Sequence, residues 1–169
     1  MRRLILMRHA KSSWSDPGQR DVDRPLNKRG QRDAPAIGEW LREKGYCPKR
    51  ALVSTAQRTK ETWEGLLSAL PACPVEFRET LYHATASGMF QALSRETDAD
   101  SVLMLGHQPG IGELAEKLLS QPFDNSEFAR YPTSAVTVID FDYDSWADVR
   151  WGTGRLQDFV YPKALRSSA

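Results

Sequence analysis

The chain has 169 residues, 40% of them hydrophobic and 27% charged, the composition of an ordinary globular protein with room for one sizeable core. Its 23 Lys and Arg residues nearly balance 22 Asp and Glu residues, and the resulting net charge of +1 gives no electrostatic argument for binding to nucleic acid or to an anionic membrane, neither of which we expect as a partner. Two cysteines are too few for a disulfide framework, and no apolar run approaches the roughly 20 residues of a membrane helix. We therefore expect a single cytoplasmic domain over residues 1–169.

The first predicted elements are a strand, a loop and a helix. The apolar run over residues 3–7 predicts a buried strand, and the polar residues 10–26 predict a loop. A helix is expected from Asn27 or Lys28, because apolar residues then recur at helical spacing, and Gly45 is expected to end it. Further elements are expected at residues 51–53 (strand), 56–70 (helix), 75–77 (strand), 86–97 (helix), 101–105 (strand) and 111–120 (helix).

The last part of the chain is expected to close the sheet. Residues 121–133 are predicted to be irregular, and residues 135–139 and 148–152 are predicted as two strands joined by a turn around residues 143–145. These two strands are expected to form an antiparallel hairpin at one edge. The alternation of strands and helices before them predicts an α/β protein, a three-layer α/β/α sandwich around a mostly parallel sheet.

Residues that can take part in catalysis or ligand binding follow four of the predicted strands directly. They are Arg8-His9 after the first strand, residues 54–62 with Arg58 after the second, Glu79 after the third, and Gly106-His107-Gln108-Pro109-Gly110 after the fourth. Because the carboxyl ends of parallel strands share one edge of the sheet, we expect these segments to converge there. Arginine binds phosphate with a planar fork of donors, and histidine can act as a covalent nucleophile. The sequence therefore predicts phosphoryl chemistry.

These segments resemble the motifs of a known family. Arg8-His9-Ala10 resembles the Arg-His-Gly signature of the histidine phosphatase superfamily, and the spacing of Ser54, Arg58 and Thr62 also matches that superfamily. The nearest resemblance is to its SixA-like phosphohistidine phosphatase branch, over residues 7–14, 23–30, 81–82 and 106–115. The resemblance implies a phosphoglycerate mutase-like fold without a large helical insertion.

The resemblance also implies roles for residues of this chain. His9 is expected to be the nucleophile that forms a phosphohistidine intermediate, with one ring nitrogen holding a proton and the other attacking phosphorus. Arg8, Arg58 and His107 are expected to surround the phosphoryl group and to stabilise the charge on its oxygens. Neither a metal ion nor another cofactor is expected.

The proton donor is the least defined role. Larger members of the superfamily place a glutamate in the loop after the third strand, and Glu79 occupies the nearest equivalent position. Asp16 and Asp23, in the loop after His9, are the alternatives. A phosphohistidine leaving group is itself an imidazole, which relaxes the need for a strong acid.

Other polar residues receive simpler interpretations. Ser54 and Thr62 are expected to cap or brace the second helix, and His83 is interpreted as a loop residue because the chain lacks a metal-ligand spacing of histidines. Lys11 and Trp14 lie in the loop after His9, where they are candidates for the substrate entrance.

The expected function is a cofactor-independent phosphatase, and the SixA-like resemblance implies phosphohistidine on a partner protein, such as a phosphotransfer domain, as its substrate. One alternative is a phosphatase of small phosphate monoesters. The other is a non-catalytic adaptor that binds phosphorylated groups. The oligomeric state is left open.

Overall fold

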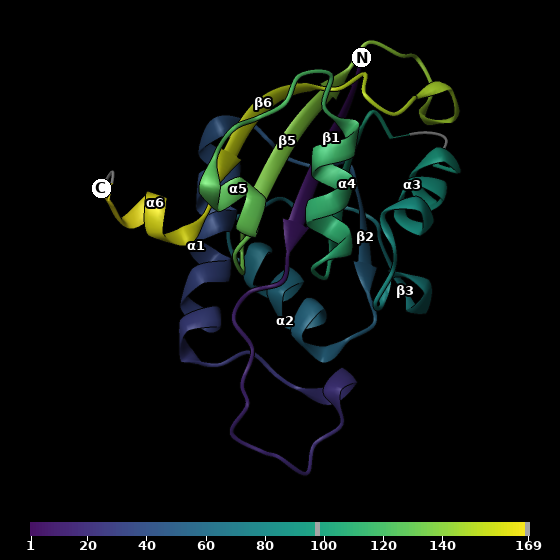
Figure 1. The fold of residues 1–169 in the computed structure, drawn as a ribbon. Helices are drawn as coiled ribbons and strands as arrows, with labels where there is room; N and C mark the ends of the chain where they lie inside the picture. Colours follow the sequence, from purple (N-terminus) through teal and green to yellow (C-terminus); the bar gives the residue numbers. More distant parts are fainter. Residues whose placement is uncertain (97–98, 168–169) are drawn as a thin grey trace.

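The computed structural model describes residues 1–96 and 99–167, and these residues form one six-stranded sheet in the order β3-β2-β4-β1-β5-β6 (Figure 1). The strands are β1 (Arg2–Arg8), β2 (Arg50–Ser54), β3 (Val75–Arg78), β4 (Ser101–Gly106), β5 (Val136–Phe141) and β6 (Arg155–Val160). Strands β3, β2, β4 and β1 pair in parallel, whereas β5 pairs antiparallel with both β1 and β6. The mixed sheet confirms the expected α/β class with an antiparallel edge pair.

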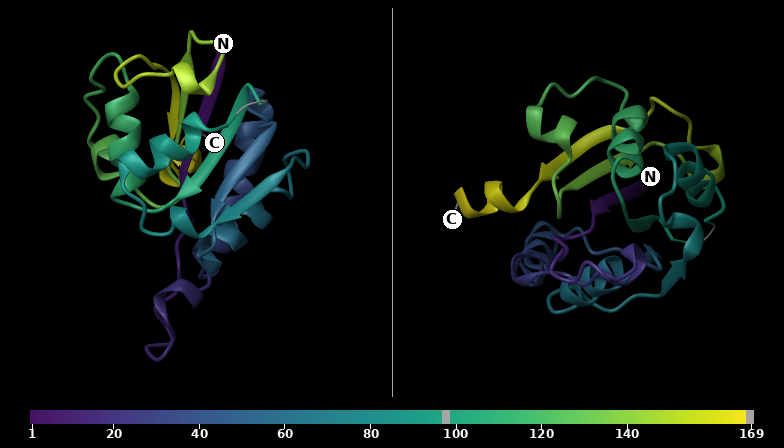
Figure 2. Two further views of the ribbon diagram at one scale, coloured as in Figure 1. Left: turned by 90° about the vertical axis from the view of Figure 1, so that its right-hand side faces the viewer. Right: turned by 60° about the horizontal axis from the view of Figure 1, so that its bottom comes forward.

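Helices cover both faces of the sheet (Figures 1 and 2). The helices are α1 (Lys28–Lys44), α2 (Gln57–Leu66), α3 (Ala86–Ser94), α4 (Gly110–Leu118), α5 (Ser126–Arg130) and α6 (Pro162–Ser167), and short 3-10 turns lie at Asp21–Asp23, Glu79–Leu81 and Trp146–Asp148. Apolar residues of α3 and α4 belong to one core and those of α1 and α2 to another. The protein is therefore a three-layer sandwich.

Strand β1 lies in the middle of the sheet because it is apolar on both faces. Leu4 and Leu6 pack into the core under α3 and α4, whereas Ile5 and Met7 pack into the core under α1 and α2. All four side chains are fully buried, the usual pattern for a strand that is covered on both sides. This burial anchors the residues that follow β1.

Helix α1 has the expected boundaries, whereas α2 and α3 end earlier than expected. Helix α1 begins after Asn27, whose side chain accepts a hydrogen bond from the Gly30 N–H, and it ends at Gly45, whose φ of 78° suits glycine. Helix α2 ends at Leu66 rather than at residue 70. The N–H groups of Ser68 and Ala69 donate to carbonyls three residues earlier, which breaks the α-helical pattern as the chain approaches Pro71. Helix α3 ends at Ser94, and residue 97 of its expected range lies outside the described residues.

The expectation for the last strand was wrong in position. Residues 148–152 are not a strand, because Trp146 is fully buried and its Nε1 donates to the Ala99 carbonyl 2.6 Å away, which holds this segment against the α3 side of the sheet. The closing strand is β6. The segment 121–133 was also expected to be irregular throughout, but it contains α5, capped by Asn125.

The loop between β1 and α1 projects from the end of the molecule where β1 terminates (Figures 1 and 2). Backbone bonds hold its two arms together: the Ser13 N–H donates to Pro25 O and the Asn27 N–H donates to Lys11 O. Among the described residues, none of the helices has the length and apolar character needed to span a membrane.

Candidate active site

The ends of β1, β2 and β4 surround a cavity of about 280 Å³. Its lining residues are Arg8, His9, Lys11, Ser12, Trp14, Asp21, Arg24, Arg58, His83, His107, Gln108 and Thr133. Four of the five residues assigned to the site from the sequence thus line one cavity, namely Arg8, His9, Arg58 and His107. Glu79 does not.

His9 follows β1 and is held by its backbone. Its N–H donates to Gly106 O at the end of β4, and the Ser134 N–H donates to its carbonyl oxygen at 3.0 Å. The Nδ1 atom of His9 lies 2.7 Å from the Ala10 carbonyl oxygen. A carbonyl oxygen only accepts, so Nδ1 carries the proton and Nε2 keeps its lone pair. Burial holds the pKa of His9 well below its usual value, and its ring is neutral near neutral pH.

Thr62 supports this arrangement from α2. Its hydroxyl accepts a hydrogen bond from the Ala10 N–H at 3.0 Å and donates to the Arg58 carbonyl oxygen at 2.7 Å. Ala10, whose carbonyl oxygen orients His9, is therefore fixed through its N–H to the helix that carries Arg58. Thr62 braces the site as well as the helix.

Arg58 and His107 are in contact. The Arg58 Nη2 lies 3.4 Å from Nδ1 of His107, and Nε2 of His107 lies 2.8 Å from the Ser54 hydroxyl oxygen. Because an arginine only donates, His107 accepts at Nδ1 and carries its proton on Nε2, facing Ser54. Burial and the charge of Arg58 lower the pKa of His107 to about 3. His107 is thus a neutral ring that orients Arg58.

Arg8 supplies a second guanidinium. Its Nη1 donates to the carbonyl oxygen of Tyr131 at 3.0 Å, which aims the side chain along the cavity wall. Burial lowers the pKa of Arg8, and the positive charge of Arg58 lowers it further. Two partly desolvated guanidiniums beside a neutral imidazole favour an anionic ligand.

The carboxylates expected from the sequence lie elsewhere. Glu79 is exposed in the 3-10 turn after β3, outside the cavity lining, so the geometry gives no support to Glu79 as the proton donor. Asp16 and Asp23 are exposed as well; Asp16 accepts from the Gly18 N–H and Asp23 pairs with Arg20. Glu79 directly follows the outer strand β3, and the chain after it reaches the site only at Tyr82 and His83.

Asp21, which the sequence analysis did not single out, is the carboxylate at the cavity. Its backbone oxygen accepts from Arg58 Nη1 at 2.7 Å and its Oδ2 accepts from Arg58 Nη2 at 3.0 Å. Oδ1 accepts from Arg24 and Oδ2 from the Tyr82 hydroxyl. Burial alone raises the pKa of Asp21, but the hydrogen bonds from Tyr82, Arg24 and Arg58 outweigh it and hold the pKa well below its usual range. Asp21 is therefore ionised.

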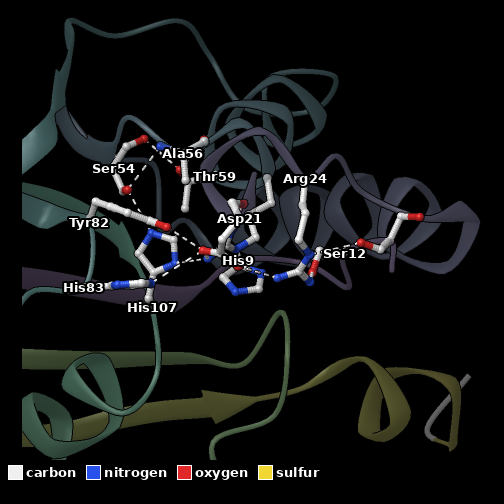
Figure 3. Close-up of polar contacts among 12 residues, drawn as sticks. His9, Ser12, Asp21, Arg24, Ser54, Ala56, Thr59, Tyr82, His83 and His107 are labelled. Atoms are coloured by element: carbon white, nitrogen blue, oxygen red, sulfur yellow. Dashed lines mark hydrogen bonds and ion pairs between the residues drawn. The ribbon is translucent and has the colours of Figure 1, made fainter. Parts of the chain in front are cut away.

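His83 also lies at the cavity rather than in a remote loop. Its ring stacks on Tyr82 with centroids 4.0 Å apart and meets the His107 ring edge-on at 5.9 Å. Figure 3 shows Tyr82, His83 and His107 to one side of Asp21, and Arg24 with Ser12 to the other. The sequence signal for His83 was its position directly after residues 81–82, which resemble the SixA-like branch. For Asp21 the signal was only its position in the loop that follows His9.

Two further expectations concern the rim and metals. Lys11 and Trp14 do line the cavity. Trp14 is 72% exposed, and the central carbon of the Arg24 guanidinium lies 3.3 Å from the centroid of its ring.

Within residues 1–96 and 99–167, His, Cys, Asp and Glu side chains form no group of three or more suited to a metal ion. Independence from metals stays a prediction.

Comparison with known proteins places this geometry in a family. The model of the histidine phosphatase superfamily (branch 1) matches residues 4–85. The uncharacterized protein Rv1276c of Mycobacterium tuberculosis is 34% identical over 163 residues, which cover 93% of this chain and all of that protein. Among solved structures, a proposed phosphohistidine phosphatase SixA from Nakamurella multipartitia superposes with a TM-score of 0.83 at 28% identity, covering 95% of this chain and 96% of the other. Its counterpart from Agrobacterium tumefaciens gives 0.79 at 29% identity, covering 95% and 98%.

The chain therefore belongs to the histidine phosphatase superfamily, and its sheet and helices have the phosphoglycerate mutase-like arrangement. Within that superfamily the protein is SixA-like, as the two structural matches show, and its general activity is that of a phosphatase.

Proposed function

We propose that this protein hydrolyses phosphohistidine on a partner protein by way of a phosphoryl group carried on Nε2 of His9. The observation that carries the proposal is the hydrogen bond from His9 Nδ1 to Ala10 O, because it leaves Nε2 as the nucleophilic nitrogen of a neutral ring. The SixA proteins matched in structure are described as proposed phosphohistidine phosphatases, which supports the choice of substrate.

The remaining site residues have complementary roles in this proposal. Arg8 and Arg58 bind the oxygens of the phosphoryl group, whose charge in the transition state is spread over them. His107 keeps the Arg58 fork in place through its Nδ1 atom, and Ser54 fixes the tautomer of His107. Water then hydrolyses phospho-His9 and regenerates the free imidazole.

The shape of the entrance supports a phosphate that is carried on a protein. The cavity is small, about 280 Å³, and the exposed Trp14 and the partly buried Lys11 stand at its wall on a projecting loop. A cavity of this size accepts a phosphoryl group and a small leaving group, while the protruding loop offers an aromatic and a cationic contact to a larger surface. A small phosphate monoester is the competing substrate class.

The test combines intact-mass measurement with turnover. The purified protein and His9→Ala are mixed in parallel, with EDTA present, with 4-nitrophenyl phosphate and with a phosphohistidine-bearing phosphotransfer domain, and then quenched at alkaline pH. We expect a one-phosphate adduct on the unmodified protein alone, and faster release of phosphate from the phosphoprotein. Faster turnover of the ester identifies a monoester phosphatase instead. Binding of the phosphoprotein with no turnover and no adduct identifies an adaptor.

A further inference from the structure

The cavity holds a third histidine in an unusual backbone conformation. His83 has a φ of 55°, a region that few non-glycine residues adopt and that costs free energy unless the surroundings enforce it. Such conformations gather at functional sites. Here Ala84, the next residue, lies so close to Gly110 at the start of α4 that a Cβ on Gly110 would be only 2.2 Å from the Ala84 carbonyl oxygen. The backbone around His83 is thus pressed against the start of α4.

The ring of His83 is positioned by its neighbours at the mouth of the cavity. It stacks on Tyr82 at 4.0 Å, it stands nearly perpendicular to the His107 ring, and its Nε2 lies 3.6 Å from Oδ2 of Asp21. The side chain is 63% exposed, so it faces both the cavity and solvent. Because the His83 side chain lines the cavity and is also open to solvent, it is accessible to a leaving group that departs from the phosphoryl group toward solvent.

The other carboxyl and imidazole groups that line the cavity within the described residues are poorly suited to exchange protons. Asp21 is held ionised by its three donors. His9 is the nucleophile, and His107 has both ring nitrogens engaged, one by Arg58 and one by Ser54. His83 remains: its ring lines the cavity, is open to solvent and has its Nε2 atom beside the Asp21 carboxylate, and an imidazole nitrogen can both donate and accept a proton.

We propose that His83, next to the ionised Asp21, donates a proton to the leaving group and then takes one from water. This inference rests on the proposed function. In the first step the Nε2 lone pair of His9 bonds to phosphorus, the bond from phosphorus to the leaving atom breaks with its electron pair on that atom, and the proton of protonated His83 neutralises it. In the second step neutral His83 removes a proton from water, the water oxygen bonds to phosphorus, and the electron pair of the P–N bond returns to His9.

The test is the dependence of the rate on the leaving group. We compare kcat/KM for 4-nitrophenyl phosphate, whose phenolate departs without a proton, with phenyl phosphate and N-phosphoimidazole, which need one. His83→Asn is the variant of choice, because Asn tolerates a positive φ and its amide does not titrate. We expect it to lose about 100-fold or more on phenyl phosphate and N-phosphoimidazole, and less than about tenfold on 4-nitrophenyl phosphate.

Two further variants make the result decisive. His83→Asp also suits a positive φ and restores a titrating group, so we expect partial recovery on phenyl phosphate relative to His83→Asn. Glu79→Gln tests the competing donor, and we expect it to keep the leaving-group dependence of the unmodified protein. An equal loss on all three substrates for His83→Asn, or a selective loss for Glu79→Gln, overturns the assignment of His83. An unmodified protein that forms no phospho-His9 and turns over none of the substrates overturns the proposed function itself.

Discussion

The Nδ1 atom of His9 lies 2.7 Å from the carbonyl oxygen of Ala10, and this one contact decides which nitrogen of His9 is nucleophilic. Ala10 is itself fixed, since its N–H donates to Thr62 on α2. The nucleophile and the helix that carries Arg58 are therefore parts of one hydrogen-bonded unit.

The first prediction concerns the protonation of His9. Because burial lowers its pKa well below the usual value near 6.5, the ring is expected to be neutral, with the proton on Nδ1, at pH 6.5, where a free imidazole is half protonated. Long-range ¹H–¹⁵N NMR spectra of the imidazoles, assigned with His9→Ala, report the tautomer directly. A His9 titration midpoint at or above 6.5 would contradict the prediction.

The second prediction concerns the loss of stability in acid. In the unfolded chain an imidazole titrates near pH 6.5, whereas in the folded protein the pKa of His107 is about 3. Below pH 6.5 the unfolded state therefore binds more protons, and the free energy of unfolding falls as the pH drops toward 3, by up to about 1.4 kcal/mol per pH unit for this residue. Urea unfolding between pH 7 and 4 measures the slope. His107→Asn is expected to flatten it, and an unchanged slope in that variant counts against a neutral His107.

The third prediction concerns the fork of Arg58. Its two terminal nitrogens reach Asp21 and His107 at the same time, which a lysine ammonium does not reproduce. Arg58→Lys is expected to lower kcat/KM by about 100-fold or more, the size of effect seen when one donor to a developing anion is removed. Steady-state kinetics on an aryl phosphate, with the Tm as a check on folding, measure it. A loss below threefold in a folded variant excludes Arg58 from phosphate binding.

The fourth prediction concerns Trp14. Its ring is 72% exposed at the cavity rim and stacks against Arg24. Exposed aromatic side chains next to arginines are common anchors in protein interfaces, so Trp14→Ala is expected to raise KM for a phosphorylated protein by about tenfold or more and to leave KM for an aryl phosphate nearly unchanged. Equal effects on the two substrates would show that Trp14 does not serve partner binding.

The fifth prediction concerns the contact under His83. Gly110→Ala would place a methyl group 2.2 Å from the backbone oxygen of Ala84, which only a backbone shift relieves. We expect a destabilisation of about 1–3 kcal/mol. Gly18→Ala is the matched control, since its nearest neighbour is the Asp16 carboxylate at 3.5 Å and little change is expected there. Denaturant unfolding of both variants measures the difference, and equal stabilities speak against a rigid contact.

The sequence by itself determined the elements and the residues at the ends of the inner strands. The apolar run of β1 places Arg8 and His9 at the carboxyl end of an inner strand, and Asn27 and Gly45 mark the ends of α1. These features depend on local chemistry: side-chain periodicity, capping and the φ that glycine allows.

The tertiary structure alone decided which loop residues complete the site. Asp21 reaches Arg58 across 37 positions of sequence and Tyr82 across 61, and no local pattern distinguishes it from Asp16 or Asp23. Glu79 follows a strand as expected, but that strand is at the outer edge, where its side chain is exposed. The position of β6 likewise depended on the burial of Trp146. Loops are placed by contacts with distant parts of the chain, and such contacts leave no periodicity in the sequence.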